Sequence, residues 1–362
     1  MEKLDTWQWQ MTNRIMDIPS LRHYVDISDE EASEIAMAQS KFRWAITPYY
    51  ASLMDRHNEH CPIRMQAIPS ILETHNQSGI QDPLQEEAQS PTPGTIHRYP
   101  DRVAFTVSSE CAMYCRHCTR KRFVGQPVQR TTWQAIQAGI EYVRNTESIR
   151  DVLVTGGDPF ILSDDRLEKI LKALRSIDHV EIIRFGTRTP CTLPQRITDR
   201  LCDMLAKYHP IWVNTHFNHP KELTEEAAKA ADRLLRVGIP LGNQSVLLRG
   251  INDSLETMKM LVHGLLKMRI RPYYMYQCDR IIGTEHFWTP LATGLDLVEQ
   301  LQGHTTGFAV PQFIVDSPIG KIPLSHSKLV ELTDDYAVLR NYEGQTMTIP
   351  CTVEAESAPV AI

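Results

Sequence analysis

The sequence predicts an α/β fold: an open barrel of six β/α units, with a helical extension before it and a short segment after it. Apolar or β-branched runs typical of strands alternate with helix-compatible segments. After a longer first interval the strand starts recur about every thirty residues, which is the length of one β/α unit. Polar side chains follow the ends of these runs, where parallel α/β folds place their active sites.

Residues 1–95 form the expected helical extension. Within it, residues 27–39 read ISDEEASEIAMAQ, where Ser28 or Asp29 can cap a helix and the acidic residues favour its first turn. Residues 81–94, QDPLQEEAQSPTPG, are rich in Pro, Glu, Gln and Ser without periodicity, which indicates a linker or surface loop. We therefore expect a domain boundary near residue 95.

Residues 96–300 carry the expected barrel, because they contain six strand-like runs. The runs are VAFTVS (103–108), VLVTG (152–156), VEIIRFGT (180–187), IWVNTHF (211–217), LGNQSVLL (241–248) and RPYYMYQC (271–278). Helix-compatible segments such as RLEKILKALRSI and TEEAAKAADRLLRVG lie between them. Six units are fewer than the roughly eight of a complete barrel, so we expect a partial TIM barrel. Residues 301–362 are the expected C-terminal segment.

The composition is that of a globular protein that acts on a small molecule. The chain has 362 residues, 42% hydrophobic and 23% charged, with a formal net charge of −6. Because the Lys and Arg residues are scattered rather than gathered in a stripe, we expect no nucleic-acid partner. No apolar run is long enough to span a bilayer and the N-terminus lacks a signal-peptide pattern, so we expect no membrane partner and a cytoplasmic location.

Three of the eight cysteines are clustered in Cys111-Ala-Met-Tyr-Cys115-Arg-His-Cys118, directly after the first strand-like run. Clustered thiols in a reducing compartment indicate metal or redox chemistry rather than a disulfide framework. Three thiolates from one loop can hold a [4Fe-4S] cluster and leave one iron open for a substrate or cofactor. The alternatives are a structural zinc site, which usually needs a second Cys/His pair, and a thioredoxin-like redox motif. The latter consists of a C-x-x-C pair, such as Cys115 and Cys118, and does not include a third cysteine like Cys111.

The spacing C-x-x-x-C-x-x-C after a first strand resembles the radical S-adenosylmethionine superfamily, and further motifs resemble its lysine 2,3-aminomutase family. These motifs are HRYPDR (97–102), CAMYCRHCTRKR (111–122), GGDPF (156–160), NTHFNHP (214–220), GNQSVLLRG (242–250) and PYYMYQCD (272–279). The resemblance covers nearly the entire chain. It implies a radical S-adenosylmethionine core and three cofactors: a [4Fe-4S] cluster, S-adenosylmethionine and pyridoxal 5′-phosphate.

For S-adenosylmethionine, the resemblance points to the end of the second strand-like run. Thr155, Gly156, Gly157 and Asp158 match the segment that holds the methionyl amino group. Glycines there permit close backbone approach, and the carboxylate can accept hydrogen bonds from an ammonium. Other polar residues near strand ends are expected cofactor contacts, namely His117, His216 and Gln244.

For pyridoxal phosphate, the resemblance points to Lys321 in the segment DSPIGKIPL. It matches the lysine that the family carries in a loop after the sixth unit, and a lysine amine can form a Schiff base. Arg98 and Arg102 would bind the phosphate through charge-assisted hydrogen bonds.

The implied substrate is a small basic amino acid. Arg120 matches the arginine that pairs with its carboxylate, a role suited to the planar guanidinium. Asp279 and Asp316 match the carboxylates that bind its distal ammonium. We expect the neighbouring Lys121 and Arg122 to be solvated.

The resemblance implies a 2,3-aminomutase, with conversion of L-lysine to L-β-lysine as the first expectation. A 5′-deoxyadenosyl radical would take a hydrogen from C3, the amino group would move from C2 to C3, and the hydrogen would return to C2. Arginine is the second substrate, since two carboxylates also accept a guanidinium, and the first radical could instead end in desaturation. The remaining alternative, a non-enzymatic iron-sulfur or zinc-binding protein, would not need Arg98, Asp158, Asp279 and Lys321 together.

The chain departs from the family pattern beside the expected substrate site. Only SPIG separates Asp316 from Lys321, where the family has a longer, glycine-rich stretch. Trp288 stands in place of a usual arginine, and Arg280 directly follows Asp279. Because these departures lie near the expected substrate side chain, they argue against strict specificity for lysine and leave arginine as a second expected substrate.

The expected partners follow from the same resemblance. Reductive cleavage needs an electron donor such as flavodoxin or ferredoxin. The family's zinc-binding cysteines are missing, since the tail has only Cys351, so no structural zinc is expected. By analogy we still expect a homodimer or a higher homo-oligomer.

Overall fold

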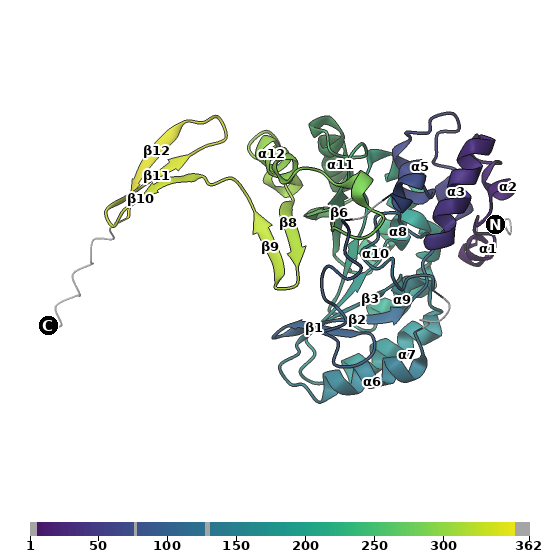
Figure 1. The fold of residues 1–362 in the computed structure, drawn as a ribbon. Helices are drawn as coiled ribbons and strands as arrows, with labels where there is room; N and C mark the ends of the chain where they lie inside the picture. Colours follow the sequence, from purple (N-terminus) through teal and green to yellow (C-terminus); the bar gives the residue numbers. More distant parts are fainter. Residues whose placement is uncertain (1–5, 76–77, 127–130, 352–362) are drawn as a thin grey trace.

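The computed structural model describes residues 6–75, 78–126 and 131–351. The N-terminal part consists of short helices that lie together at one side of the molecule (Figure 1). They are α1 (Trp7–Thr12), α2 (Ile18–Leu21), α3 (Asp29–Lys41), α4 (Pro48–Ala51), α5 (Pro62–Ala67) and the 3-10 helix η2 (Ile71–Thr74). The helix expected over residues 27–39 is α3, which begins where the Ser28 side chain accepts a hydrogen bond from the Glu31 backbone.

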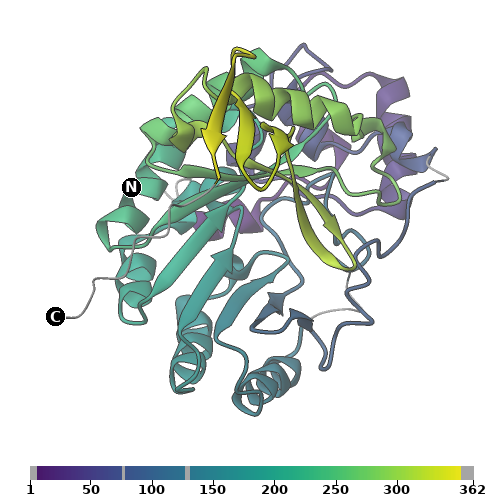
Figure 2. The same ribbon diagram turned by 90° about the vertical axis from the view of Figure 1, so that its left-hand side faces the viewer.

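A nine-stranded sheet forms the body of the protein, with its strands side by side in chain order. They are β1 (Thr95–Tyr99), β2 (Arg102–Ser108), β3 (Asp151–Gly156), β4 (Ile182–Gly186), β5 (Ile211–Thr215), β6 (Leu241–Leu247), β7 (Arg271–Gln277), β8 (Gln312–Ser317) and β9 (Gly320–Leu324). The six predicted strands are confirmed as β2 to β7, and β2 to β8 all run parallel. Because β1 and β9 end the sheet without pairing with each other, the barrel is open (Figure 2).

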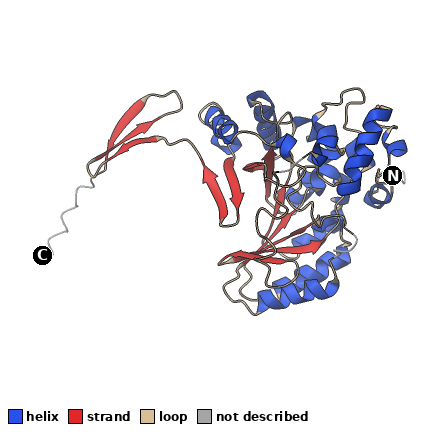
Figure 3. Cartoon of the chain, viewed as in Figure 1, coloured by secondary structure: helices blue, strands red, loops and turns tan. Residues whose placement is uncertain are grey.

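Helices cross over between the parallel strands and surround the sheet (Figure 3). They are α6 (Trp133–Arg144), α7 (Asp164–Arg175), α8 (Thr189–Thr192), α9 (Asp199–Ala206), α10 (Glu225–Arg236), α11 (Leu255–Lys267) and α12 (Leu291–Leu301). In α7 the buried side chains Leu167, Ile170, Leu171 and Leu174 recur at helical spacing, which turns one apolar stripe toward the core. Among the helices in the described part of the chain, none combines the length and apolarity needed to cross a membrane.

The sheet continues past residue 300, because β8 pairs with β7 and β9 folds back along β8. The expectation that Lys321 lies in a loop is therefore wrong, since it is on β9, opposite Asp316 on β8. Pro318 and Gly320 break the apolar run and hide the two short strands in the sequence. The position of β8 follows from its parallel pairing with the free edge of β7, which joins residues distant in sequence.

The last described strands form a second, smaller sheet. They are β10 (Leu329–Leu332), β11 (Tyr336–Arg340) and β12 (Thr346–Pro350), and they pair only with each other. Figure 1 shows this sheet projecting away from the barrel. Its apolar side chains are largely exposed, with Leu332 at 63% and Met347 at 66%.

Candidate active site

The cysteine loop follows β2 and places its three thiols within electrostatic reach of one another. Burial, then the charges of Asp158, Cys118 and Cys115, raises the pKa of Cys111 well above the usual value. Burial, then the charge of Cys115, raises the pKa of Cys118 to about 11. All three thiols are free of disulfides. Such thiols lose their protons when they bind a metal, so this donor set fits an iron-sulfur cluster.

The three thiols come from one short loop, with three residues between Cys111 and Cys115 and two between Cys115 and Cys118. Among residues 6–75, 78–126 and 131–351, no three Cys, His, Asp or Glu side chains converge as ligands of one metal ion do. In a [4Fe-4S] cluster each cysteine binds a different iron, so its ligands need not converge on one point. Three cysteines on one loop are a donor set of the kind that such clusters use.

The N-terminal helices hold this loop through a buried ionic contact that the sequence did not reveal. Arg116 donates from Nη2 to Oε2 of Glu73 on η2, and Lys121 Nζ lies 2.8 Å from the same oxygen. Burial acts to raise the pKa of Glu73, but Arg116 and Lys121 outweigh it and lower the pKa to about 2. Burial lowers the pKa of Lys121 to about 8. The expectation that Lys121 and Arg122 are solvated is wrong, because their side chains are 5% and 7% exposed.

Arg188, two residues after the end of β4, contacts the cysteine loop and was not singled out from the sequence. Its Nη1 donates to Cys115 Sγ at 2.8 Å, and its Nη2 donates to Glu222 and to Gln66. The guanidinium is thus a buried donor to a sulfur that would bind iron. Hydrogen bonds to such sulfurs tune the reduction potential of a cluster.

His117 and His216 lie together beside the loop, with ring centroids 5.4 Å apart. Burial, then the charge of Arg188, lowers the pKa of His117 well below its usual value and that of His216 to about 3. Both imidazoles are therefore neutral. Nδ1 of His117 and Nε2 of His216 are buried and have no hydrogen-bond partner among the described residues, which fits the expectation that they contact a polar ligand.

At the end of β3 the two glycines press against the cysteine loop. A Cβ on Gly156, whose φ is +139°, would lie 2.2 Å from the Ser108 carbonyl oxygen, and one on Gly157 would lie 2.3 Å from that of Glu110. The close backbone approach that the glycines permit is thus made to the end of β2 and to the residue before Cys111. Asp158 accepts hydrogen bonds from Thr187 Oγ1 at 2.7 Å and from the Arg188 backbone at 2.8 Å. Its contact with a cofactor stays a prediction.

Lys321, Asp316 and Arg98 form one charged cluster. Lys321 Nζ donates to Asp316 Oδ2 at 2.7 Å, and Arg98 Nη1 donates to Asp316 Oδ1 at 2.9 Å. The Lys321 backbone N–H donates to the Tyr99 hydroxyl at 2.8 Å, and Nζ lies 5.7 Å from the Tyr276 ring centroid. The side chain is 33% exposed, so it is only partly buried, while its backbone is anchored to Tyr99.

Two further expected cofactor residues lie on strands of the same sheet, Arg102 at the start of β2 and Gln244 in β6. Arg102 holds its guanidinium 3.8 Å from the Tyr99 ring centroid and donates to Asp101 at 2.8 Å. Gln244 is half-buried on β6, next to Tyr274 of β7. Their binding of a cofactor stays a prediction.

Arg120 and Asp279 complete the group of expected substrate residues. Arg120 donates from Nη2 to Glu86 Oε1 at 2.8 Å and from Nη1 to Thr155 Oγ1 at 3.4 Å. Asp279 Oδ2 accepts from Thr119 Oγ1 at 2.6 Å. Burial raises the pKa of Asp279 to about 6. The hydrogen bond from Thr119 acts to lower this pKa, and the negative charge of Asp316 acts to raise it. The structure therefore brings a guanidinium, two carboxylates and an amine into one region.

The raised pKa of Asp279 gives a pH prediction for the binding of a cationic ligand. Below about pH 6 the free protein holds a proton on this carboxylate, whereas a bound ammonium favours the ionised form. Binding then releases a proton, and affinity for a basic amino acid should be roughly tenfold lower at pH 5 than at pH 7. Calorimetry in two buffers of different ionisation enthalpy measures this proton release.

Asp279→Asn removes the titrating group, so the variant should bind weakly at both pH values and release no proton. Asp334→Asn, on the far small sheet, is the matched control and should keep the wild-type pH dependence. Proton release that persists in Asp279→Asn would assign the titration to another group.

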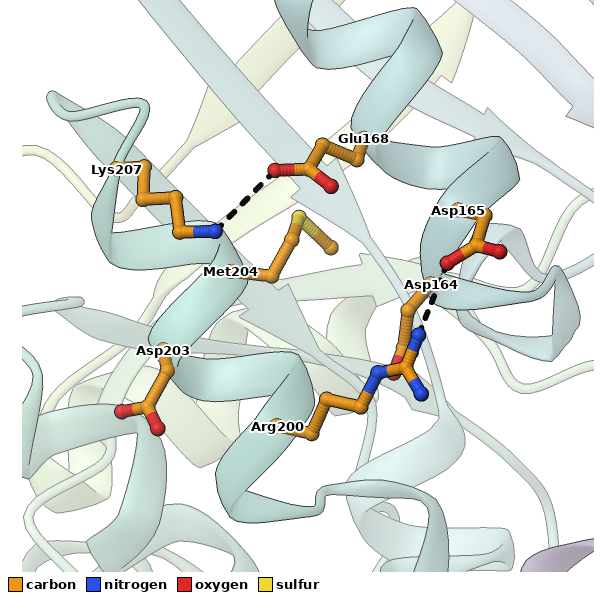
Figure 4. A pocket seen from close by; sticks show the side chains of 7 residues that line it. All are labelled: Asp164, Asp165, Glu168, Arg200, Asp203, Met204 and Lys207. Atoms are coloured by element: carbon orange, nitrogen blue, oxygen red, sulfur yellow. Dashed lines mark hydrogen bonds and ion pairs between the residues drawn. The ribbon is translucent and has the colours of Figure 1, made fainter.

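A surface pocket between α7 and α9 is not part of this site. It is lined by Asp164, Asp165, Glu168, Arg200, Asp203, Met204 and Lys207. Figure 4 shows that its charged groups pair with each other, as in the contacts of Arg200 with Asp165 and of Lys207 with Glu168. These are exposed ion pairs on the surface of the helices, and such pairs contribute little to the stability of the fold.

The chain is similar in sequence to known proteins over most of its length. Residues 105–261 match the family model described as radical SAM superfamily, and residues 298–358 match the one described as lysine-2,3-aminomutase. An L-lysine 2,3-aminomutase of Fusobacterium nucleatum is 52% identical over 350 residues, which cover 96% of this chain and 82% of that protein. One of Clostridium subterminale is 50% identical over 94% of this chain and 83% of its own length. A glutamate 2,3-aminomutase of Clostridioides difficile is 46% identical over 96% of this chain and 82% of its own length.

Proposed function

The chain belongs to the lysine 2,3-aminomutase family of radical S-adenosylmethionine enzymes, and we propose that it converts L-lysine to L-β-lysine. The family's cofactors are a [4Fe-4S] cluster, S-adenosylmethionine and pyridoxal phosphate. When bound, they supply the radical that removes a hydrogen from the substrate and the π-system that lets the amino group migrate. The protein supplies binding, alignment and the exclusion of water.

The observation that carries the proposal is the distribution of charge around Lys321. Arg120 provides a guanidinium for an α-carboxylate, and Asp279 and Asp316 provide anions for a distal cation. Asp316 accepts a hydrogen bond from the ammonium of Lys321 at 2.7 Å, which supports a role for its carboxylate in binding an amine. An acidic side chain would meet two carboxylates there, so this site disfavours glutamate.

In this proposal each residue acts on a stated part of the ligands. Cys111, Cys115 and Cys118 hold the cluster, and Lys321 attaches pyridoxal phosphate. We propose that Arg98, whose Nη1 lies 2.9 Å from Asp316 Oδ1, binds that cofactor's phosphate or orients the carboxylate. When the amine of Lys321 is engaged by the cofactor, Asp316 loses one of its two cationic partners, and the distal ammonium of the substrate can replace it.

Arginine is the second candidate substrate, and the surroundings of Asp279 favour it. Trp288 donates from Nε1 to the Asp279 carbonyl at 3.2 Å, and the Arg280 guanidinium lies 4.8 Å from the Trp288 ring. A tryptophan ring attracts a guanidinium through its π-system, and two carboxylates can pair with one. A guanidinium substrate could use the same features.

The direct test is anaerobic incubation of the reconstituted protein with dithionite, S-adenosylmethionine, pyridoxal phosphate and either L-lysine or L-arginine. We expect an amino-acid product of unchanged mass with the NMR signals of a β-amino acid, formed faster from lysine. A product lighter by two hydrogens would replace rearrangement with desaturation. Unchanged substrate in both reactions would overturn the proposal.

Partners and location are part of the same proposal. A reducing protein of the flavodoxin or ferredoxin kind would deliver the electron, and the chain would act as a homodimer or higher homo-oligomer. All eight cysteines are free, which suits a reducing compartment, and we place the reaction in the cytoplasm.

A further inference from the structure

Glu86 lies in the segment expected to be a linker or surface loop, yet it is buried against the site. Only 5% of the residue is exposed. Its carboxylate accepts hydrogen bonds from Arg120 Nε at 3.2 Å and Nη2 at 2.8 Å, and from Arg122 Nη2 at 3.1 Å. Burial acts to raise the pKa of Glu86, but Arg120 outweighs it and lowers the pKa, so the carboxylate is ionised.

The polypeptide around Glu86 is fixed to the rest of the site. Arg98 donates from Nη2 to the Leu84 carbonyl at 3.0 Å and from Nε to Gln89 Oε1 at 2.7 Å. Gln89 in turn donates to the carbonyl of Pro318, in the turn between β8 and β9, at 3.1 Å. This segment is therefore a wall of the site, held in place at both its ends.

Glu86 uses only one edge of the Arg120 guanidinium. The carboxylate takes the edge formed by Nε and Nη2, while Nη1 points to Thr155 Oγ1 at 3.4 Å. A guanidinium has five N–H donors, and among the described residues Arg120 has no side-chain acceptor other than these two. The second edge, formed by Nη1 and Nη2, keeps donors for another carboxylate.

We propose that Glu86 is a positioning residue for the substrate: it holds Arg120 by one edge so that the other edge meets the α-carboxylate of the amino acid. The inference rests on the proposed function, in which Arg120 binds that carboxylate. Without Glu86 the long side chain has several rotamers available, and its charge has no fixed direction. Glu86 stays in place when substrate binds, because leaving would separate it from two buried guanidinium groups.

The test compares ligands with and without a carboxylate on the holoenzyme. Binding of L-lysine and of 1,5-diaminopentane is followed by the absorption change of the pyridoxal cofactor. In Glu86→Gln we expect the dissociation constant of L-lysine to rise roughly tenfold, because the carboxylate contact is misplaced. The constant for 1,5-diaminopentane should stay at the wild-type value. In turnover, KM should rise while kcat changes by less than about threefold.

Glu87→Gln is the matched control, because Glu87 also pairs with Arg122 but its side chain is 78% exposed. It should leave both ligands unaffected. Glu86→Asp keeps the charge and should give an intermediate loss for lysine alone, which keeps the test valid if Glu86→Gln folds poorly. The inference would be overturned if Glu86→Gln raised the dissociation constants of L-lysine and 1,5-diaminopentane equally, left that of L-lysine unchanged, or lowered it. Failure of the proposed function would differ, since the wild type would then not bind lysine.

Discussion

Replacing Lys321 with alanine is expected to lower turnover at least about a thousandfold. The side chain supplies the amine at the centre of the charged cluster, 2.7 Å from Asp316 Oδ2. Its loss leaves Asp316 paired with Arg98, so the fold of the β8–β9 hairpin should be retained. Borohydride reduction of the wild type should trap the cofactor covalently on the protein, and mass spectrometry should find no such adduct in the variant.

Lys328→Ala is the matched control for this experiment. Lys328 pairs with Glu299 away from the site, and its replacement should change neither turnover nor the adduct. Iron content should be the same in all three proteins, which separates cofactor attachment from cluster assembly. A covalent adduct that survives in Lys321→Ala would assign attachment to another lysine.

Replacing Cys115 with serine is expected to abolish activity by removing one of three cluster ligands. Cys115 is central in the loop, and Arg188 donates to its sulfur at 2.8 Å. A serine hydroxyl stays protonated at neutral pH and is a poor ligand for iron. Iron and sulfide should fall from about four of each per chain to well below one, together with the visible absorbance of the cluster.

Cys351→Ser controls for the loss of any thiol, because Cys351 is exposed and distant in sequence from the loop. It should keep full iron content and turnover. Cys202→Ser controls for the loss of a buried thiol in α9, and should lower stability without removing iron. Iron retained in Cys115→Ser at the wild-type level would exclude that cysteine from the cluster.

Six strands of the barrel, β2 to β7, were predictable because each is a short run rich in apolar or β-branched residues. In β3 the buried residues Val152 and Val154 face the core from a run that the sequence marks plainly. The crossover helices carry the same kind of local signal, since Thr224 caps α10 and a stripe of buried alanines and Leu234 follows. Such features depend on near neighbours in sequence, so pattern reasoning finds them.

Burial of charged residues was not predictable in the same way. Lys121 and Arg122 have the composition of a solvated surface, and the segment around Glu86 has that of a linker. Glu73 lies 48 residues from Lys121, and Glu86 lies 34 residues from Arg120. Each carboxylate compensates the charge of its partner, which allows the partner to be buried. No local pattern records a partner at such separation.

The sequence by itself determined the parallel α/β barrel, the loop of three cysteines and, through its motifs, the family of radical enzymes to which the chain belongs. These depend on hydrophobic period, residue type and spacing, which a linear chain displays. Only the tertiary structure decided that Lys321 lies on a strand opposite Asp316, that Arg188 reaches Cys115, and that Glu86 occupies one edge of Arg120. These contacts join residues brought together by folding, and buried charges are stable only where that folding supplies their partners.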